Sequence, residues 1–456
     1  MVQLKSEGKN SHLRKTVVYS TAEGMVAQVY TTLAGPGSAI LTRYLVFLGA
    51  GVMDFTLYSI VGQISQITAI LGTWLVKKFR DTKRVTVSTI SIGKILSFAF
   101  GIIPFLVPSS VAVKVFLALF FVSVSLQAIG GNVWLSWMAG VIPARIRGRF
   151  FSRRSQFLML AGLVSGFVFS AVVDAFSPEG GVIHSAAVRL SSKIFAPHNL
   201  IYVFAGIFFT AGAVGVIGIR ILKKQPSPLQ EEIPEKSPLA HIKEALTDRK
   251  FLRLLGAKMW WMLAIGIGAP FWQPFMLKGL GMSVTEVQIY TTISLIANIL
   301  ALRIWGEIID RFGNRPVLSM VVLLGGLYPF IWLFVSPTNY YLVFLEAVFS
   351  GIVWSGDGLG WFNLLLKIFP RQKVQVYAAL FSAVSVLGSV LTSYLSGVLF
   401  PHRGVFGLAP EQILFAVGGL ARLSAFFPIS KIEEHNTGTI ADSVKFVLKK
   451  FHLFAG

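Results

Sequence analysis

The chain has 456 residues, of which 54% are hydrophobic and only 13% are Asp, Glu, Lys or Arg. Soluble globular domains carry about a quarter charged residues, so this composition excludes an ordinary soluble domain and indicates apolar segments along the whole length. The net charge is +21, and the absence of cysteine excludes disulfides and thiolate metal sites.

Taken in chain order, the apolar segments predict twelve membrane-spanning helices, because one span needs roughly 20 mostly apolar residues. The segment 16–76 must hold two of them, with the break near residues 49–51. The expected spans are 16–40, 46–76, 85–107, 111–138, 155–177, 199–221, 252–277, 283–309, 316–336, 339–366, 374–400 and 411–430.

The basic residues predict an orientation for these spans. Most of the 41 Lys and Arg residues lie at the chain ends or in connections that share one side with them. Such residues collect in cytoplasmic loops, so both termini are expected in the cytoplasm, and the charge needs no nucleic-acid partner. The opposite side carries few: Arg43, Lys114, Arg189, Lys193, Lys278 and Arg403.

Polar segments predict the division of the chain. Residues 222–250 are rich in proline and charge, as expected of a cytoplasmic linker between two bundles at 1–221 and 251–430. Residues 431–456 form a cytoplasmic tail. Within it, 440–454 has an apolar face flanked by lysines, which suits either a helix on the inner leaflet or a loosely ordered tail.

The two halves repeat each other. Residues 48–58 (LGAGVMDFTLY) and 280–290 (LGMSVTEVQIY) share Leu, Gly, Val, an acid and Tyr in register. The dipeptides at 35–36 (Gly-Pro) and 269–270 (Ala-Pro) also correspond in order. An ordered set of such matches indicates two related six-helix halves, the arrangement that a rocking transporter uses around a midplane site.

One loop carries a family signature. Residues 306–316 read GEIIDRFGNRP, which resembles the G-x-x-x-D-R-x-G-x-R/K loop of the major facilitator superfamily. The first-half counterpart, residues 72–84, keeps Gly72 and the basic cluster but has Val76 in place of the acid. The resemblance implies a conformational clamp, stronger in the second half. The matching residues are Gly306, Asp310, Arg311, Gly313 and Arg315.

This resemblance implies an all-α integral membrane protein with 12 transmembrane helices, arranged as two pseudo-symmetric six-helix bundles around a central cavity. It further implies a monomeric secondary transporter in the cell membrane that moves a small organic solute, coupled to a proton, without a cofactor and without enzymatic activity. An uncoupled facilitator, an amphiphile or lipid flippase and, more remotely, a sensor stay open. Span five lacks the Gly-Pro-rich motif of proton-driven drug antiporters, and span four has no arginine, so that subgroup is disfavoured but stays open.

Ionisable side chains inside spans are expensive and mark functional candidates. Asp357 lies in a glycine-rich stretch about 16 Å along span ten from Glu346, at 1.5 Å rise per residue, and is either a coupling carboxylate or an inert hydrogen-bonded acid. Glu23 and Lys258 occupy near-equivalent positions in the halves, where they would face each other as a coupling or substrate pair or as a static ion pair. Glu346 and Asp174 are interpreted as hydrated outer residues.

Aromatic and amide side chains in the cavity-forming spans suit a sugar or another polar organic solute, although tryptophan is also enriched at membrane interfaces. These cavity candidates are Gln127, Asn132, Trp134, Trp137, Trp261, Gln273, Trp361 and Asn363. Two further acids, Asp54 and Glu286, fall in the first turns of spans two and eight and are predicted to cap them.

Overall fold

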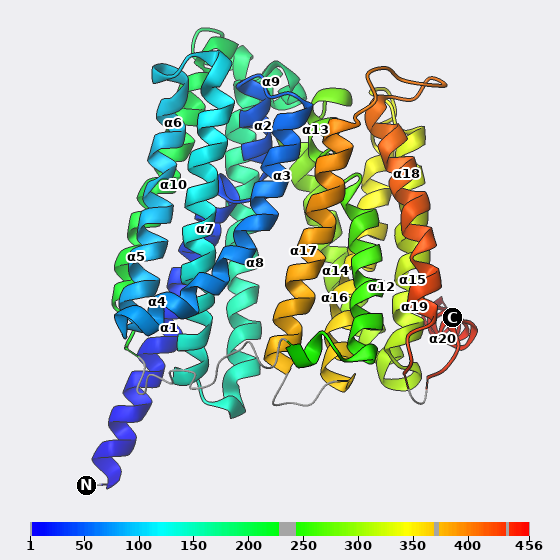
Figure 1. Ribbon diagram of the computed structural model, residues 1–456. Helices are drawn as coiled ribbons and strands as arrows, with labels where there is room; N and C mark the ends of the chain where they lie inside the picture. The colour runs from blue at the N-terminus through cyan, green and yellow to red at the C-terminus, as the bar shows by residue number, and fades with distance from the viewer. Residues whose placement is uncertain (1, 228–242, 369–373, 435–436, 456) are drawn as a thin grey trace. The chain divides into compact units, whose positions relative to one another are not determined.

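The computed structural model of the chain describes residues 2–227, 243–368, 374–434 and 437–455 (Figure 1). Ten helical segments in these ranges are long and apolar enough to cross a membrane, which confirms the all-α membrane class. They match expected spans two to six and eight to twelve: Val52–Phe79, Thr82–Leu106, Ser109–Val141, Arg145–Ala175, Pro197–Lys223, Val284–Phe312, Asn314–Phe334, Leu342–Lys367, Tyr377–Val398 and Pro410–Ser430.

The described helices divide into two compact units. Unit 1 holds the described residues up to 227 and residues 281–288, and unit 2 holds 243–280 and the described residues from 289 onward. The expected linker lies largely outside the described residues. Up to residue 227 the main helices are α1 Val2–Ala34, α2 Ala39–Phe47, α3 Val52–Ile67, α4 Leu71–Phe79, α5 Thr82–Ile95, α6 Ser97–Leu106, α7 Ser109–Val141, α8 Ala144–Ala175, α9 Gly181–Leu190 and α10 Leu200–Lys223.

The second half repeats this plan. Its elements are α12 Arg249–Gly266, α13 Trp272–Pro274, the π-helical turn η4 Phe275–Gly279, α14 Val284–Phe312, α15 Asn314–Leu327, the 3-10 turn η5 Tyr328–Phe334, α16 Leu342–Ile368, α17 Val374–Val398, α18 Pro410–Ser424, α19 Phe426–Ser430 and α20 Ile440–Ala455. The segment 440–454 is helical, as α20, and its Phe446 and Val447 pack against the unit 2 core. Its place on the inner leaflet stays a prediction.

The first span of each half is broken rather than continuous. Helix α1 ends at Ala34, before Gly35-Pro36, and α12 ends at Gly266, before Ala269-Pro270. Proline removes a backbone donor, and its ring clashes with the preceding turn, so a helix stops at or before it. The continuous helices expected at 16–40 and 252–277 are therefore corrected to pairs of shorter segments. Twelve spans require both broken segments to cross the membrane.

The internal repeat is visible in the backbone. Gly49 and Gly281 occupy equivalent positions, with φ of 82° and 68°, in the left-handed region that glycine enters without steric cost. Five residues after each glycine an acid caps the following helix: Asp54 accepts a hydrogen bond from Gly51 N at 2.9 Å, and Glu286 accepts one from Ser283 N at 2.8 Å. Both predicted caps are confirmed.

An aromatic cluster fills unit 1 where α2, α6, α7 and α10 meet. Tyr44 contacts Phe116 and Phe208 edge-on, with ring centroids 5.5 and 4.7 Å apart, and Phe100 is fully buried beside them. Helices α5 and α7 run side by side (Figure 1). Their close approach depends on Gly93, where a Cβ would lie 2.7 Å from the Ser123 carbonyl oxygen.

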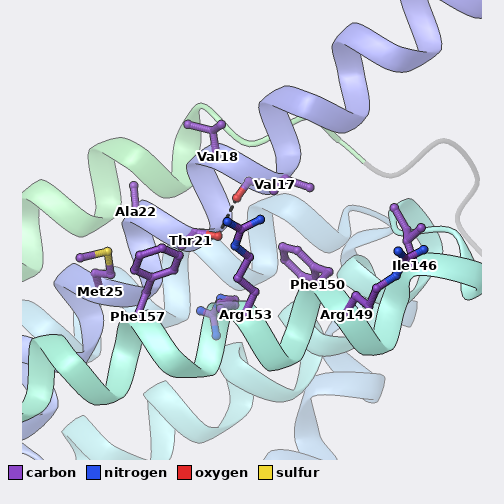
Figure 2. Close-up of a pocket in the computed structure, with 11 residues that line it drawn as sticks. Val17, Val18, Thr21, Ala22, Met25, Ile146, Arg149, Phe150, Arg153 and Phe157 are labelled. Carbon is purple, nitrogen blue, oxygen red and sulfur yellow. Dashed lines mark hydrogen bonds between the residues drawn. The ribbon is translucent and has the colours of Figure 1, made fainter.

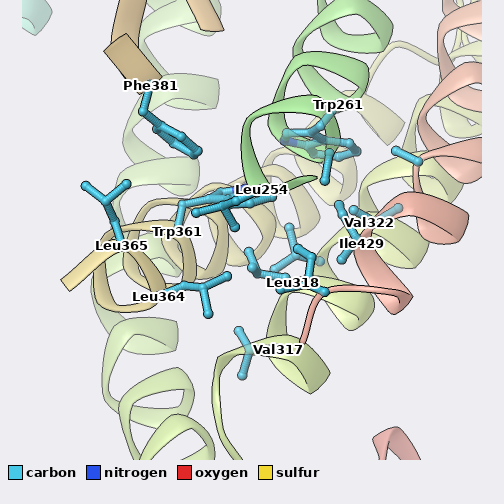
Figure 3. Packing of buried hydrophobic residues seen from close by; sticks show 14 of the residues in the cluster. Leu254, Trp261, Val317, Leu318, Val322, Trp361, Leu364, Leu365, Phe381 and Ile429 are labelled. Carbon is cyan, nitrogen blue, oxygen red and sulfur yellow. The ribbon is translucent and has the colours of Figure 1, made fainter. Parts of the chain in front are cut away.

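Unit 2 has one extensive hydrophobic core, which Figure 3 shows from close by. Leu254 and Trp261 of α12, Leu318 of α15 and Trp361 of α16 interlock in it. Lys258 and Asp357 are buried beside this core, so their charged groups lie among apolar side chains rather than in bulk water.

Candidate functional site

A buried ion pair joins α12 to α16 in unit 2. Lys258 Nζ lies 3.1 Å from Asp357 Oδ2 and 3.3 Å from Oδ1, and both residues are 7% exposed. Trp361 donates its indole N–H to Asp357 Oδ1 at 2.9 Å, and its ring centroid lies 5.1 Å from the ammonium nitrogen of Lys258. Both charges are therefore compensated within a single apolar core.

The glycines around Asp357 set how closely α16 packs. A Cβ on Gly356 would lie 2.6 Å from Val321, and one on Gly360 would lie 2.8 Å from Leu318. Helix α16 runs unbroken through them. The glycine-rich stretch thus lets α15 approach α16, and no opened helix exposes carbonyls at Asp357.

A second buried cluster lies in unit 1. Glu23 of α1 is 6% exposed, and its carboxylate is 3.4 Å from Lys94 Nζ and 3.8 Å from Arg154 Nη2. Lys94 lies over the ring of Tyr30 at 5.7 Å, and the Tyr30 hydroxyl accepts from Gln127 at 3.3 Å. Two cations and one carboxylate therefore meet in a mostly apolar bundle.

These two clusters replace the expected partnership of Glu23 with Lys258. Each of the two residues has its ion-pair partners in its own unit. The near-equivalent positions of Glu23 and Lys258 in the repeat predict that both charges lie inside spans. They do not specify which helices pack around each residue. Lys94 and Arg154 were not among the candidates, since nothing in local sequence separates a packed basic residue from one at a helix end.

Several other polar residues are more buried than the sequence indicated. Glu346 is 2% exposed and Asp174 1% exposed, so neither is a hydrated outer residue. Asp174 accepts from the backbone N–H groups of Val284 and Thr285 at 2.9 and 2.7 Å, which caps the start of α14 within unit 1. Neighbouring helices bury both carboxylates, and the position of a residue along its own helix does not predict that burial.

The signature loop is organised by a residue outside the signature. Glu434 accepts from the backbone N–H groups of Asn314 and Arg315 at 2.9 and 2.8 Å, and Lys367 Nζ lies 2.9 Å from it. Burial alone would raise the pKa of Glu434, but the hydrogen bonds from Lys367, Arg315 and Asn314 outweigh it and hold the pKa below its usual range. Glu434 thereby caps α15 and ties it to the end of α16.

The signature residues themselves lie around this cap. Arg311 lies over the Phe446 ring of α20 at 4.6 Å, Gly313 precedes α15, and Asp310 is exposed. Gly306 is half-buried on α14, and Arg315 contributes its backbone N–H to Glu434. A conformational clamp at this loop stays a prediction, now with Glu434, Lys367 and α20 as its contacts.

The cavity candidates fall into two groups. Trp137 and Trp261 are each 1% exposed and are packed inside the bundles, and Trp137 donates to the Pro226 carbonyl. Trp361 is also buried, at 4% exposed, and the others are at least partly exposed: Gln127, Asn132, Trp134, Gln273 and Asn363. A role for any of them in binding a solute stays a prediction.

Comparisons with known proteins agree with this architecture. A family model described as Major Facilitator Superfamily matches residues 261–452. The multi-drug resistance efflux pump PmrA of Streptococcus pneumoniae is 26% identical in an alignment covering 42% of this chain and 49% of the pump. The match thus spans about half the length of that curated relative.

Solved transporter structures share the fold along nearly the whole chain. The inward-open xylose transporter XylE from E. coli has a TM-score of 0.65 at 14% identity, covering 95% of this chain and 99% of the transporter. The nucleoside transporter NupG has a TM-score of 0.64 at 12% identity, covering 92% and 98%. At such identities the likeness establishes the fold, and the Major Facilitator Superfamily model matches the second half of the chain within that fold.

Proposed function

We propose that the chain is a secondary transporter that moves a small organic solute by alternating access, coupled to a proton through Asp357 and Lys258. The observation that carries the proposal is the buried ion pair between these two residues. Removing two charges from water costs several kcal/mol per ion, and an apolar pair of similar volume is often at least as stable. Stability alone therefore gives little reason for an ion pair in this core.

The pair has the chemistry that coupling requires. A proton on Asp357 removes the negative charge and releases Lys258 from its partner, so the loaded and unloaded pairs favour different arrangements of α12 and α16. Trp361 holds one carboxylate oxygen in both cases, because its N–H donates to either form of the acid. Helix α12 ends a short distance beyond Lys258, before the broken stretch at Pro270, where a small movement is least costly.

Relatives and structural neighbours support transport and leave the solute open. A crystal structure described as a D-xylose–proton symporter shares the fold with a TM-score of 0.66, and the partial relative is described as an efflux pump. The sequence has no G-x-x-x-x-G-K-[ST] segment, which fits a gradient-driven rather than an ATP-driven carrier. Twelve spans, a monomeric state, a cell-membrane location and cytoplasmic termini belong to the same proposal.

The test begins with a ligand screen. Purified protein is heated with sugars, nucleosides, dipeptides and cationic dyes, and the compounds that raise Tm are carried into proteoliposome uptake. The proposal expects concentrative uptake or extrusion that follows an imposed pH gradient and collapses with a protonophore. Movement of the solute at the same rate with and without the gradient identifies an uncoupled facilitator instead.

A further inference from the structure

A cavity of about 700 Å³ lies between α1 and α8 in unit 1, within the size range of small-molecule sites (Figure 2). The eleven residues that line it, all in the described part of the chain, include three arginines and no acid. They are Val17, Val18, Thr21, Ala22, Met25, Ile146, Arg149, Phe150, Arg153, Arg154 and Phe157. The surface of the cavity is almost entirely apolar, so the arginines line it mainly with the carbon atoms of their side chains.

Helical spacing explains how α8 presents both kinds of side chain together. Arg149 and Arg153 are four residues apart, while Phe150 and Phe157 are seven apart, so each pair lies along one side of the helix. Arg149 and Arg153 are exposed, and both also line a smaller adjoining hollow of about 480 Å³ with Ser152. The adjoining hollow has a larger polar share of surface than the cavity, so these two exposed arginines place positive charge at the rim of the apolar cavity.

Arg154 is held differently and forms part of the cavity wall. Its Nε donates to the Ser20 carbonyl at 3.2 Å, its guanidinium carbon lies 4.5 Å from the Trp134 ring centroid, and its Nη2 is 3.8 Å from Glu23. A Cβ on Gly24 would lie 2.4 Å from this Nη2, so the glycine leaves the space that Arg154 occupies. Arg154 therefore connects the cavity to the buried Glu23–Lys94 pair.

We propose that this cavity binds an amphiphilic anion, that is, a phosphate or carboxylate group attached to an apolar body. Arg149 and Arg153 would hold the acid group through charge-assisted hydrogen bonds, for which planar guanidinium groups are well suited. Phe150, Phe157 and Met25 would contact the apolar body. The inference goes beyond the proposed function, since binding here does not require coupling at Asp357.

The binding test uses the full chain in phosphatidylcholine nanodiscs with 1-naphthyl phosphate as probe, measured by isothermal titration calorimetry. Neutral 1-naphthol lacks the phosphate group, so its affinity measures the contribution of the acid group. Inorganic phosphate lacks the ring, so its affinity measures the contribution of the apolar body. We expect 1-naphthyl phosphate to bind at least tenfold more tightly than either, because each lost charge-assisted hydrogen bond or buried ring costs about a factor of ten or more.

Matched variants test the residues. Arg149→Gln and Arg153→Gln should each weaken probe binding about tenfold, and Phe157→Ala should weaken it several-fold. Arg145→Gln removes the same charge from the exposed start of the same helix, outside the cavity lining, and should leave the affinity unchanged. Thermal unfolding midpoints of the variants establish that each is folded.

A final arm separates the two sources of such an anion. If phosphatidylglycerol added to the nanodiscs displaces the probe, the natural occupant is an anionic membrane lipid; if it does not, the occupant is a soluble organic anion. Equal affinity for 1-naphthyl phosphate and 1-naphthol overturns the proposal. So does unchanged probe affinity when Arg149 and Arg153 are both glutamine.

Discussion

Trp361 donates its indole N–H to Asp357, one helical turn before it on α16, at 2.9 Å. The other carboxylate oxygen of Asp357, Oδ2, lies 3.1 Å from Nζ of Lys258 on α12. One contact is local and fixes the acid on its own helix, while the other crosses between helices and disappears when either partner loses its charge. The contact with Trp361 can therefore persist while the contact with Lys258 is released. Substituting both Lys258 and Asp357 tests the second contact.

The ion pair should show strong coupling in a double-mutant cycle. Lys258→Met or Asp357→Leu alone leaves an uncompensated buried charge and should destabilise the protein by about 3–5 kcal/mol. The double variant carries no buried charge and should be far more stable than the sum of the single effects predicts. Tm values in detergent measure the cycle, and additive losses would show that the two charges do not interact.

Loss of the Glu434 carboxylate, which caps α15, should destabilise the protein more than loss of the neighbouring Glu433 carboxylate. Glu434→Gln removes the charge that holds the start of α15 and should cost about 1 kcal/mol, as loss of a helix cap does. Glu433→Gln is the matched control, because Glu433 pairs with Arg253 at the surface, where both side chains are about two-thirds exposed and such pairs contribute about 0–1 kcal/mol. Equal losses of Tm for both variants would contradict the cap.

The same residue predicts a pH dependence. The pKa of Glu434 in the folded protein lies below its ordinary value of 4.5, so its stabilisation is complete above about that pH and is lost as the pH falls through the folded pKa. The difference in Tm between the native protein and Glu434→Gln should therefore shrink on acidification below pH 4.5. A difference that stays constant down to the acid limit would contradict the assignment.

The orientation can be tested without background labelling, because the chain has no cysteine. A thiol introduced at Val182 in α9 should react with a membrane-impermeant maleimide in intact cells, since this residue is 86% exposed on the side assigned to the outside. A thiol at Ser237, in the expected linker, should react only after the cells are opened. The reverse pattern would place the basic loops outside and refute the charge-based orientation.

The helix caps and the membrane spans could be predicted from the sequence, because each depends on residues close together in the chain. The caps at Asp54 and Glu286 involve partners three residues away, so the sequence alone specifies them. The span pattern likewise follows from composition over about 20 residues. The prolines at 36 and 270 belong to the repeat, and each follows the end of a helix that hydropathy alone predicts to be continuous.

Partnerships between distant segments were not predictable in the same way. Lys258 and Asp357 were both chosen as buried charges, but their mutual contact depends on how α12 packs against α16. Lys94 was not among the candidates and nevertheless lies beside Glu23. Glu434 lies in the tail, beyond any motif, and is identified only by the backbone N–H groups that it accepts from.

Gradient-driven transport by Asp357→Asn tests the account most directly. Asparagine mimics the protonated acid, keeps an oxygen that can accept from Trp361, and cannot release a proton at physiological pH. In proteoliposomes loaded with the solute found by the ligand screen, we expect this variant to exchange solute across the bilayer but to lose accumulation driven by a pH gradient. Accumulation at the native level in Asp357→Asn would remove this residue from the coupling mechanism.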